Sequence, residues 1–381
     1  MTGTAAPGGP WTHAARLADA LIAGGTEAEV VALARPGGPV PAAARAPVRR
    51  VDSQARAVDP AGEAEEDVAR LARALADAPA ADVLHAEDPI AGAAALRARG
   101  EARVVVTVHH LEAAESEGTE ELQRVAVQGA DARATATRFW AGRIETLFGA
   151  GAEVIANGVD AATFAEGPGR AAAGARLGWG PRPVVLGLGG IARRKGSRLL
   201  LEAFARARSR LGAEPLLAVA GAAPAERDAP YSRAFVEDAE RLGLVVADHP
   251  HSFGADVVLL GPIPPESMPV LVRAADVLAV PSTREGSPLA VLEAAVAGRA
   301  AVVSDLPSLR ETLTHGVHAL MVPPGEAGPL ADAIVGLVRS PDLAEGLARE
   351  AAGLAREATW EAAAAAYREL YEVGPEGGVR R

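Results

Sequence analysis

The sequence predicts an α/β protein of two domains, each a parallel sheet with helices on both faces. Short apolar runs alternate with helix-length segments over most of the 381 residues. The runs are rich in β-branched residues without polar alternation, which is typical of strands buried on both faces. The length also exceeds what one hydrophobic core usually supports. Alternation of this kind favours parallel sheets in both halves.

The first domain is expected to cover residues 1–166. Its apolar runs predict strands at 29–34, 81–86, 103–110 and 152–160. A Gly-Gly loop and a helix stand close to the start of the chain, where a Rossmann-like domain needs a strand first. Residues 1–6 are too short and polar to supply a good strand, so we expect the first strand to be either missing or degraded.

The second domain is expected to cover residues 183–358, after a linker at 167–182 that is rich in Gly, Pro and Ala. Helices are expected at 197–212 and 287–298, and the apolar runs predict strands at 183–190, 216–221, 257–263, 276–282, 300–305 and 318–325.

The last segment, 359–381, is expected to form a helix that docks back on the first domain. Thr359 is a suitable N-cap residue. Behind it, Trp360, Tyr367, Leu370 and Tyr371 form an aromatic and apolar stripe of the kind that packs against another surface.

Composition excludes several classes of protein. Lys and Arg number 38 and Asp and Glu 49, a net charge of −11 that argues against nucleic-acid binding. A hydrophobic content of 49% excludes a disordered chain, and no apolar run approaches the ~20 residues that span a bilayer. The chain has no cysteine and no recognisable secretory signal, so the expected location is the cytoplasm. The helix at 138–149, with Phe139, Trp140 and Phe148, is expected to pack into the core rather than contact a membrane.

The strongest chemical signal follows the first strand of the second half. Lys195, the only lysine of an arginine-rich chain, stands in a basic loop before a helix that Ser197 is expected to cap. Helix N-termini offer free N–H groups and a positive dipole end, which attract phosphate. We therefore expect Lys195 to hold a phosphate group.

The same segment also allows a different interpretation. Gly187, Gly189 and Ala192 fit a Gly-x-Gly-x-x-Gly/Ala dinucleotide fingerprint. Three basic residues separate this pattern from the expected helix, and the next strand is followed by no acidic residue for a ribose. A nicotinamide-dependent oxidoreductase is therefore retained only as an alternative.

A second signal is a pair of glutamates around the start of the expected helix at 287–298. Glu285 precedes the helix and Glu293 lies eight residues later, inside it. Carboxylates accept paired hydrogen bonds from vicinal hydroxyls, such as those of sugars and riboses. The two residues therefore predict a site for a ligand that carries hydroxyl groups.

With these motifs in order, the chain resembles family 4 of the retaining glycosyltransferases, whose two Rossmann-like domains face each other across a cleft (the GT-B architecture). The resemblance covers nearly the whole chain. The matching motifs are Gly8-Gly9 with His13, the segment ending in His110, Asn157-Gly158-Val159-Asp160, Lys195-Gly196, the segment from Leu259, the Glu285–Glu293 spacing, Glu311 and the segment from Val322.

The resemblance implies a role for each matched residue. Lys195 would hold the donor diphosphate, Glu285 the hydroxyls of the transferred sugar, and Glu293 the nucleotide ribose. His110 would contact the donor sugar, so His110, Lys195 and Glu285 are the expected catalytic residues, whereas His109 is expected to be structural. The expected donor-binding residues are Gly9, Gly190, Arg194, Lys195, Ile263, Glu285, Gly286, Ser287, Pro288, Leu289, Ala290 and Glu293.

The implied reaction is a retaining, metal-independent transfer from a UDP-, GDP- or ADP-sugar to an acceptor that the sequence does not specify. Negative charge grows on the departing nucleoside diphosphate, and fixed cations and helix N-termini stabilise it. No Asp-x-Asp triplet is present to hold a metal. Asp248, His249 and His251 have metal-binding side chains but lie in a long polar connection, so no metal is assigned to them.

One residue departs from the family pattern. Gly190 stands where the family usually has an arginine, which leaves Arg193 or Arg194 to supply that charge. This departure and the expected loss of the first strand favour a second alternative, a non-catalytic protein that binds sugar nucleotides.

Overall fold

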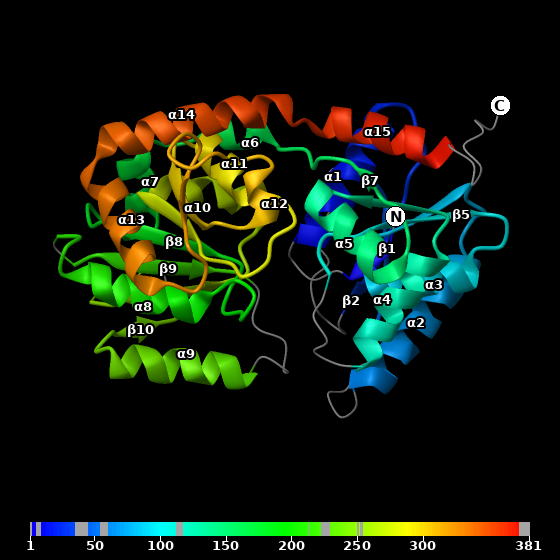
Figure 1. Cartoon of the computed structure of the whole chain (residues 1–381), viewed down its shortest axis with the longest axis horizontal. Helices are drawn as coiled ribbons and strands as arrows, with labels where there is room; N and C mark the ends of the chain where they lie inside the picture. Colours follow the sequence, from blue (N-terminus) through cyan, green and yellow to red (C-terminus); the bar gives the residue numbers. More distant parts are fainter. Residues whose placement is uncertain are drawn as a thin grey trace. The chain divides into compact units, whose positions relative to one another are not determined.

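The computed structural model describes residues 2–4, 9–34, 45–53, 60–111, 117–212, 214–221, 229–249, 251 and 254–372. Gly8 of the first-half motif and the tail 373–381 lie outside them. The chain divides into two compact units (Figure 1), unit 1 being Met1–Gly158 with Ala358–Arg381 and unit 2 being Val159–Glu357. The chain therefore leaves unit 1, completes unit 2, and returns to unit 1 for its last helix.

Unit 1 is built on a parallel sheet with the strand order β3-β2-β1-β4-β5-β6-β7. The predicted strands are confirmed as β2, β4, β5 and β7, and β3 and β6 are additional to them. The strands are β1 (Thr2–Thr4), β2 (Val30–Ala34), β3 (Val48–Asp52), β4 (Val83–Ala86), β5 (Arg103–Thr107), β6 (Ala132–Thr135) and β7 (Glu153–Val154).

The expectation that the first strand is missing is wrong. β1 pairs in parallel with β2, with Thr2 opposite Val31 and Thr4 opposite Leu33, and Thr2 also pairs with Ala86 of β4. A strand between two neighbours gains ladder hydrogen bonds on both sides, and threonine suits a strand. Pairing therefore supplies what this short, polar segment lacks in apolar side chains.

Helices cover both faces of this sheet. They are α1 (Gly9–Ala23), α2 (Pro60–Ala76), α3 (Pro89–Ala98), α4 (Glu117–Gly129), α5 (Arg138–Phe148) and α15 (Trp360–Glu372). Trp140 and Ile144 of α5 are buried in the core, and Phe139 and Phe148 pack against it, as expected. No helix in the described ranges is long and apolar enough to cross a membrane.

α15 docks on α1 within unit 1, which confirms the expected return of the C-terminal helix. The Thr359 hydroxyl caps it by accepting a hydrogen bond from the Ala362 N–H at 3.1 Å. Trp360, Tyr367 and Leu370 are buried in one cluster with apolar residues of α1 and β5.

Gly158, from the Asn-Gly-Val-Asp motif, makes this docking possible. A Cβ at this position would lie 2.4 Å from the backbone nitrogen of Trp360. Any side chain there would push the start of α15 away, so the motif has a structural role here.

Unit 2 repeats the architecture with the parallel order β10-β11-β9-β8-β12-β13-β14. Its strands are β8 (Val184–Leu188), β9 (Leu216–Ala220), β10 (Val246–Ala247), β11 (Val257–Gly261), β12 (Val277–Val280), β13 (Ala300–Ser304) and β14 (Leu320–Val322). Its helices are α6 (Ala161–Ala165), α7 (Arg170–Arg176), α8 (Ser197–Arg208), α9 (Ala229–Arg241), a 3₁₀ helix (Pro265–Ser267), α10 (Met268–Ala274), α11 (Leu289–Val296), α12 (Pro307–Arg310), α13 (Ala327–Arg339) and α14 (Pro341–Glu357).

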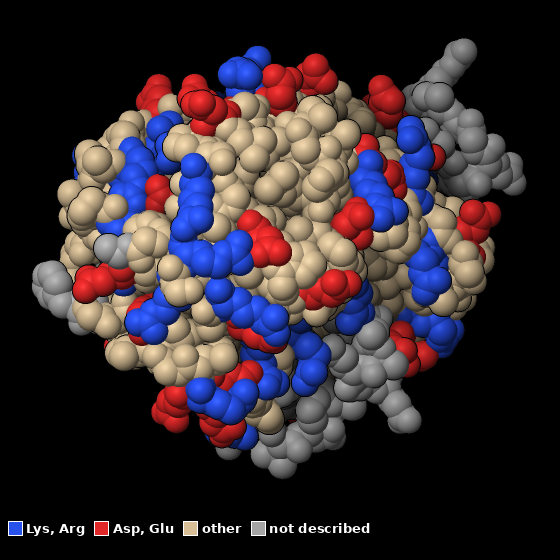
Figure 2. All heavy atoms as spheres, turned by 60° about the vertical axis from the view of Figure 1, so that its left-hand side comes forward, with Lys and Arg blue, Asp and Glu red and all other residues tan. Residues whose placement is uncertain are grey.

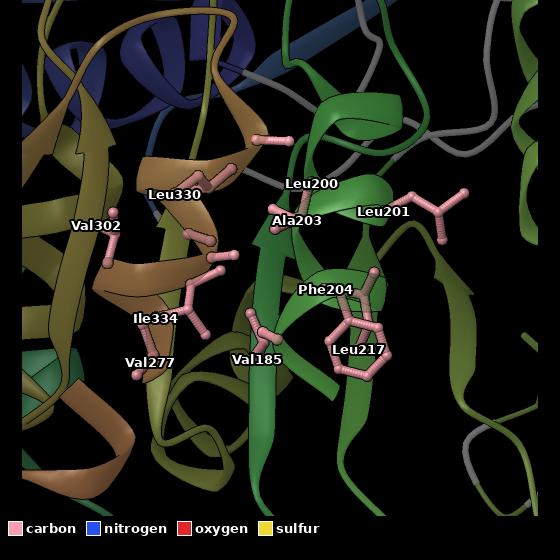
Figure 3. Packing of buried hydrophobic residues seen from close by; sticks show 14 of the residues in the cluster. Val185, Leu200, Leu201, Ala203, Phe204, Leu217, Val277, Val302, Leu330 and Ile334 are labelled. Atoms are coloured by element: carbon pink, nitrogen blue, oxygen red, sulfur yellow. The ribbon is translucent and has the colours of Figure 1, made fainter. Parts of the chain in front are cut away.

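The core of unit 2 forms where α8 and α13 pack on the sheet. Figure 3 shows side chains of four neighbouring strands directed toward these helices. The strands contribute Val185, Leu217, Val277 and Val302, and the helices Leu200, Ala203, Phe204, Leu330 and Ile334. This packing fixes the start of α8 over the sheet, next to the loop that carries Lys195.

The structure places residues 167–182, which were expected to be a linker, inside unit 2. They contain α7, which packs against α10. The Arg170 guanidinium donates to both carboxylate oxygens of Asp276, at 3.0 and 2.6 Å. The chain passes between the units near Gly158 and Ala358 instead.

Both sheets have one point where the strand order reverses. It lies between β1 and β4 in unit 1 and between β8 and β12 in unit 2. In open parallel sheets, ligands bind beyond the carboxyl ends of the strands at such a point. The residues that follow these four strands are therefore the first place to look for function.

Candidate functional site

The reversal point of unit 2 holds a lysine–glutamate ion pair. Lys195 follows β8, Glu285 follows β12, and Lys195 Nζ lies 2.7 Å from Glu285 Oε1. The exposed fractions of the two side chains are 22% and 11%. The sequence predicted both residues at one site, and the structure brings them into direct contact in a partly accessible position.

Backbone contacts hold the two loops together. The N–H of Thr283 donates to the Arg194 carbonyl at 2.8 Å. Gly196, between Lys195 and α8, has a φ of 65°, and a Cβ there would lie 2.1 Å from the Pro281 carbonyl oxygen. Only glycine allows this approach, so Lys195-Gly196 is a structural requirement as well as a chemical one.

Two serines orient Glu285. The Ser282 hydroxyl donates to Glu285 Oε1 at 2.6 Å, and the Ser308 hydroxyl donates to the Glu285 carbonyl at 2.7 Å. Ser197, by contrast, does not cap α8 as expected. Its hydroxyl accepts from the Ala192 N–H at 3.0 Å and so closes the basic loop on itself.

The ion pair changes the proton affinity of both groups. Burial by itself raises the pKa of Glu285, but the charges of Lys195 and Arg194 and the hydrogen bonds outweigh it, so the pKa lies below its ordinary value. Burial lowers the pKa of Lys195, and the Glu285 carboxylate offsets this only in part. The site thus combines an ionised carboxylate with an incompletely solvated ammonium group.

The arginines of the loop diverge. Arg194 Nη1 lies 3.6 Å from Glu285 Oε2, so its guanidinium belongs to the ion-pair cluster. Arg193 lies over the Tyr231 ring, 5.2 Å from its centroid. Gly190 has a φ of 72°, in which an arginine would be strained. Of the two arginines that the sequence offered for this charge, Arg194 is the one within ion-pair distance of Glu285.

The other expected donor-binding residues of unit 2 stand in segments that follow strands of the same sheet. Ile263 follows β11, and the N–H of Gly221 after β9 donates to the Gly261 carbonyl at 2.9 Å. Glu293 lies within α11 and is partly buried. The loop and first turn before it comprise Gly286, Ser287, Pro288, Leu289 and Ala290.

The two expected residues of unit 1 are placed within that unit. Gly9 is exposed at the first position of α1. His110 is half-buried, three residues beyond the end of β5. Both lie in segments that follow strands of the sheet, although the sequence predicted no strand before Gly9 and a strand that reached His110.

Sequence reasoning missed a buried cluster at the reversal point of unit 1. Glu87, just after β4, is contacted by three imidazoles. His13 Nδ1 lies 3.1 and 3.0 Å from its two oxygens, His109 Nε2 lies 2.8 Å from Oε2, and His85 Nε2 lies 3.6 Å from Oε1. The signal was available, because His85, Glu87 and His109 stand at the ends of neighbouring buried strands.

The cluster continues to α15. His85 hydrogen-bonds through Nδ1 to the Tyr371 hydroxyl and through Nε2 to the Thr107 hydroxyl, both at 2.7 Å. Burial lowers the pKa of His85 to about 3. Burial alone would raise the pKa of Glu87, but the facing imidazoles bring it well below its ordinary value. The carboxylate is therefore ionised although it is inaccessible to solvent.

A cavity of about 580 Å³ borders the Lys195 loop, lined in part by Arg193, Gly196, Tyr231 and Thr283. Neither Lys195 nor Glu285 lines it, so it adjoins the ion pair without containing it. Figure 2 brings the unit 2 side forward, and on this face basic and acidic side chains are interspersed.

The oxidoreductase alternative does not fit the local geometry. A dinucleotide fingerprint requires a helix directly after its glycines, but α8 begins at Ser197, beyond the basic loop. His249 and His251 are exposed, and the His251 N–H donates to His249 Nδ1 at 3.2 Å. They belong to no group of three candidate metal ligands within the described ranges.

Two family descriptions match the chain. Residues 7–163 match "Glycosyltransferase Family 4", and residues 182–340 match "Glycosyl transferases group 1". The matches cover the two halves that the sequence pattern separates.

Curated relatives include two proteins named D-inositol 3-phosphate glycosyltransferase. The one from Corynebacterium jeikeium is 32% identical over 60% of this chain and 53% of its own length. The one from Kribbella flavida is 32% identical over 65% of this chain and 58% of its own length. The chain spans about half the length of the curated relatives it matches first.

Solved structures share the fold across the whole chain. A sucrose-phosphate synthase from Thermosynechococcus elongatus has a TM-score of 0.77 at 22% identity, covering 97% of this chain and 94% of its own. HepE of Anabaena, solved with UDP and glucose, has a TM-score of 0.75 at 19% identity and covers 97% of both chains.

Proposed function

The chain belongs to the family 4 glycosyltransferases, and from this premise we propose that it transfers a sugar, with retention of configuration, from a nucleotide-sugar donor bound in unit 2. One observation carries the proposal, namely the Lys195–Glu285 ion pair at the reversal point of the sheet, with a separation of 2.7 Å. The pair offers a cation for a diphosphate and a carboxylate for sugar hydroxyls within one partly exposed site.

The proposed chemistry follows the charge that the reaction creates. As the glycosidic bond breaks, negative charge moves onto the leaving nucleoside diphosphate. The Lys195 ammonium and the Arg194 guanidinium are already fixed beside that position, so they stabilise the charge without reorganising. Glu285 and its serine partners hold these cations in place before the donor arrives.

Glu293 and the turn before α11 complete the proposed donor site. The carboxylate of Glu293 would accept hydrogen bonds from the ribose hydroxyls. The amides from Gly286 to Ala290 would face the pyrophosphate, where a helix N-terminus favours an anion. Ile263 would contact the base through its main chain, and Gly9 and His110 are the residues proposed from unit 1.

UDP-glucose is the first donor to test, because the HepE relative was solved with it. Thermal unfolding is measured with UDP, GDP and ADP and with their glucose esters. A ligand at 100 times its Kd adds ~2.7 kcal/mol of stability, which is easily detected. The donor that is found to bind is then incubated with the protein. Release of its sugar is followed by NMR, which also reports the anomeric configuration of that sugar.

Activity without added Mg²⁺ or Mn²⁺ is expected, because charge stabilisation comes from the protein's own cations. Arg206→Ala is the matched control, since it removes an exposed cation from α8 whose ion pair within the described ranges is with Glu202. The proposal fails if no nucleotide shifts the unfolding temperature of unit 2. It also fails if Lys195→Ala binds and turns over the donor like Arg206→Ala.

A further inference from the structure

The cluster beneath α15 has the composition of a metal-binding site. His13 from α1, Glu87 after β4 and His109 after β5 bring one candidate ligand atom each to within 4.8 Å of one another. Within the described ranges no other group of three His, Asp or Glu residues does so. We propose that His13, Glu87 and His109 bind a divalent transition-metal ion with the ligand chemistry of zinc.

The distances between the ligand atoms are close to those of an occupied site. Two ligands of a tetrahedral zinc, each ~2.0–2.1 Å from the ion, lie ~3.3 Å apart. Glu87 Oε2 lies 3.0 Å from His13 Nδ1 and 2.8 Å from His109 Nε2. A small outward movement of the two imidazoles, by a few tenths of an ångström, would admit the ion.

The charge of the cluster also calls for a cation. The Glu87 side chain is 0% exposed, and in the described part of the chain its charged partners are imidazoles only. A buried carboxylate is stable only where positive charge and hydrogen bonds surround it. A divalent ion would bring two positive charges to Glu87 and use the lone pairs of both imidazoles, whereas no lysine or arginine of the described residues pairs with Glu87.

Neighbouring side chains orient the ligands as in known metal sites. The Tyr367 hydroxyl lies 3.5 Å from His13 Nε2, the ring nitrogen on the far side from Glu87, and 2.8 Å from the Thr107 hydroxyl. His85 stays outside the ligand set, because Tyr371 and Thr107 already occupy both of its ring nitrogens. The 13% exposure of the His109 side chain offers a route of entry.

The ion would be structural. It would join α1 to the ends of β4 and β5 and, through Tyr367, secure α15 on unit 1. The proposed transfer reaction takes place at the unit 2 pair and does not use this ion. The two proposals therefore stand or fall separately.

Metal content tests the inference directly. The full-length chain, purified without a histidine tag, is analysed for metals by mass spectrometry, and one zinc per chain is expected. Glu87→Gln and His109→Asn should each lose it, while His110→Ala, the neighbouring histidine outside the ligand set, should retain it. Circular dichroism establishes that each variant is folded.

A second measurement covers variants that fail to fold. The metal is removed from the unaltered protein with a chelator, and Co²⁺ is added. Intense absorption bands of tetrahedral Co²⁺ and a rise in the unfolding temperature are expected. The inference is overturned if the purified protein holds no transition metal and neither Co²⁺ nor Zn²⁺ alters its absorption or unfolding temperature.

Discussion

The two reversal points place a carboxylate in the same topological position and use it differently. Glu87 follows β4 in unit 1 and Glu285 follows β12 in unit 2, each beside the strand where the sheet changes direction. Each carboxylate faces a basic residue from the segment after the first strand of its unit, His13 or Lys195. The His13 and Glu87 side chains are 1% and 0% exposed, whereas Lys195 and Glu285 are 22% and 11% exposed.

The covering element accounts for the difference. Tyr367 and Tyr371 of α15 hydrogen-bond into the unit 1 cluster and seal it. Lys195 and Glu285 stand in the loops after β8 and β12, and their side chains remain partly exposed. One topology thus provides a sealed polar centre that holds a domain together and an open one that can bind a ligand.

The largest effect is expected from a substitution in the open centre of unit 2. Lys195→Ala should reduce donor turnover by ~10²–10³, the usual cost of losing one group that stabilises developing charge. Steady-state kinetics with the best donor measures it, with Arg206→Ala as the control. If Lys195→Ala kept half of the parent kcat, the phosphate role of this centre would be wrong.

Substituting Glu293 and Glu285 one at a time distinguishes nucleotide binding from sugar transfer at the open site. Glu293→Ala should weaken binding of free nucleoside diphosphate by roughly tenfold, the loss of one charged hydrogen bond. Glu285→Ala should bind the diphosphate no more weakly than the parent, because Lys195 loses its competing partner, but should transfer sugar poorly. Calorimetry and kinetics on both variants distinguish the roles, and equal losses of diphosphate affinity would contradict the assignment.

A milder substitution tests how much α15 stabilises the buried cluster of unit 1. Tyr367→Phe removes the hydroxyl that bonds Thr107 and lies near His13, which should lower the free energy of unfolding by ~0.5–1.5 kcal/mol. Of the four tryptophans, Trp11, Trp140 and Trp360 lie in unit 1 and Trp179 in unit 2. In the Trp179→Phe background, tryptophan fluorescence therefore follows the unfolding of unit 1 alone. An unchanged midpoint would show that the hydroxyl does not contribute.

The smallest expected effect is the acid response of unit 2. The folded-state pKa of Glu285 lies below its unfolded value near 4.5, so the carboxylate's contribution is complete above that value. It is lost as the pH falls through the lower folded value. Trp179 fluorescence should show this loss in the parent and not in Glu285→Gln. An identical acid profile in both would mean that the ion pair does not stabilise unit 2.

Most of the fold follows from apolar periodicity, which marks buried parallel strands plainly. β1 escaped prediction because its three residues depend on pairing with β2 and β4, which no local pattern records. The segment 167–182 was predicted to be a linker because it is rich in Gly, Pro and Ala. It is held in unit 2 by the hydrogen bonds between Arg170 and Asp276, which are 106 residues apart in the sequence.

The candidate sites divide in the same way. Lys195 and Glu285 stand in motifs at the ends of strands, so their placement at one site could be predicted, although their direct contact could not. The complete unit 1 cluster could be identified only from the three-dimensional structure. His13 meets Glu87 from 74 residues away, and Tyr367 comes from the far end of the chain.

The return of α15 to unit 1 has a consequence for how the protein is made. Domains usually fold in the order in which they leave the ribosome, the N-terminal one first. Here unit 2 is complete once Glu357 is synthesised, while unit 1 still lacks the helix that covers Leu17 and Leu21. We therefore expect the nascent chain to complete the folding of its second unit before that of its first. A message truncated after codon 357 should yield a protein whose first unit exposes an apolar face that chaperones bind.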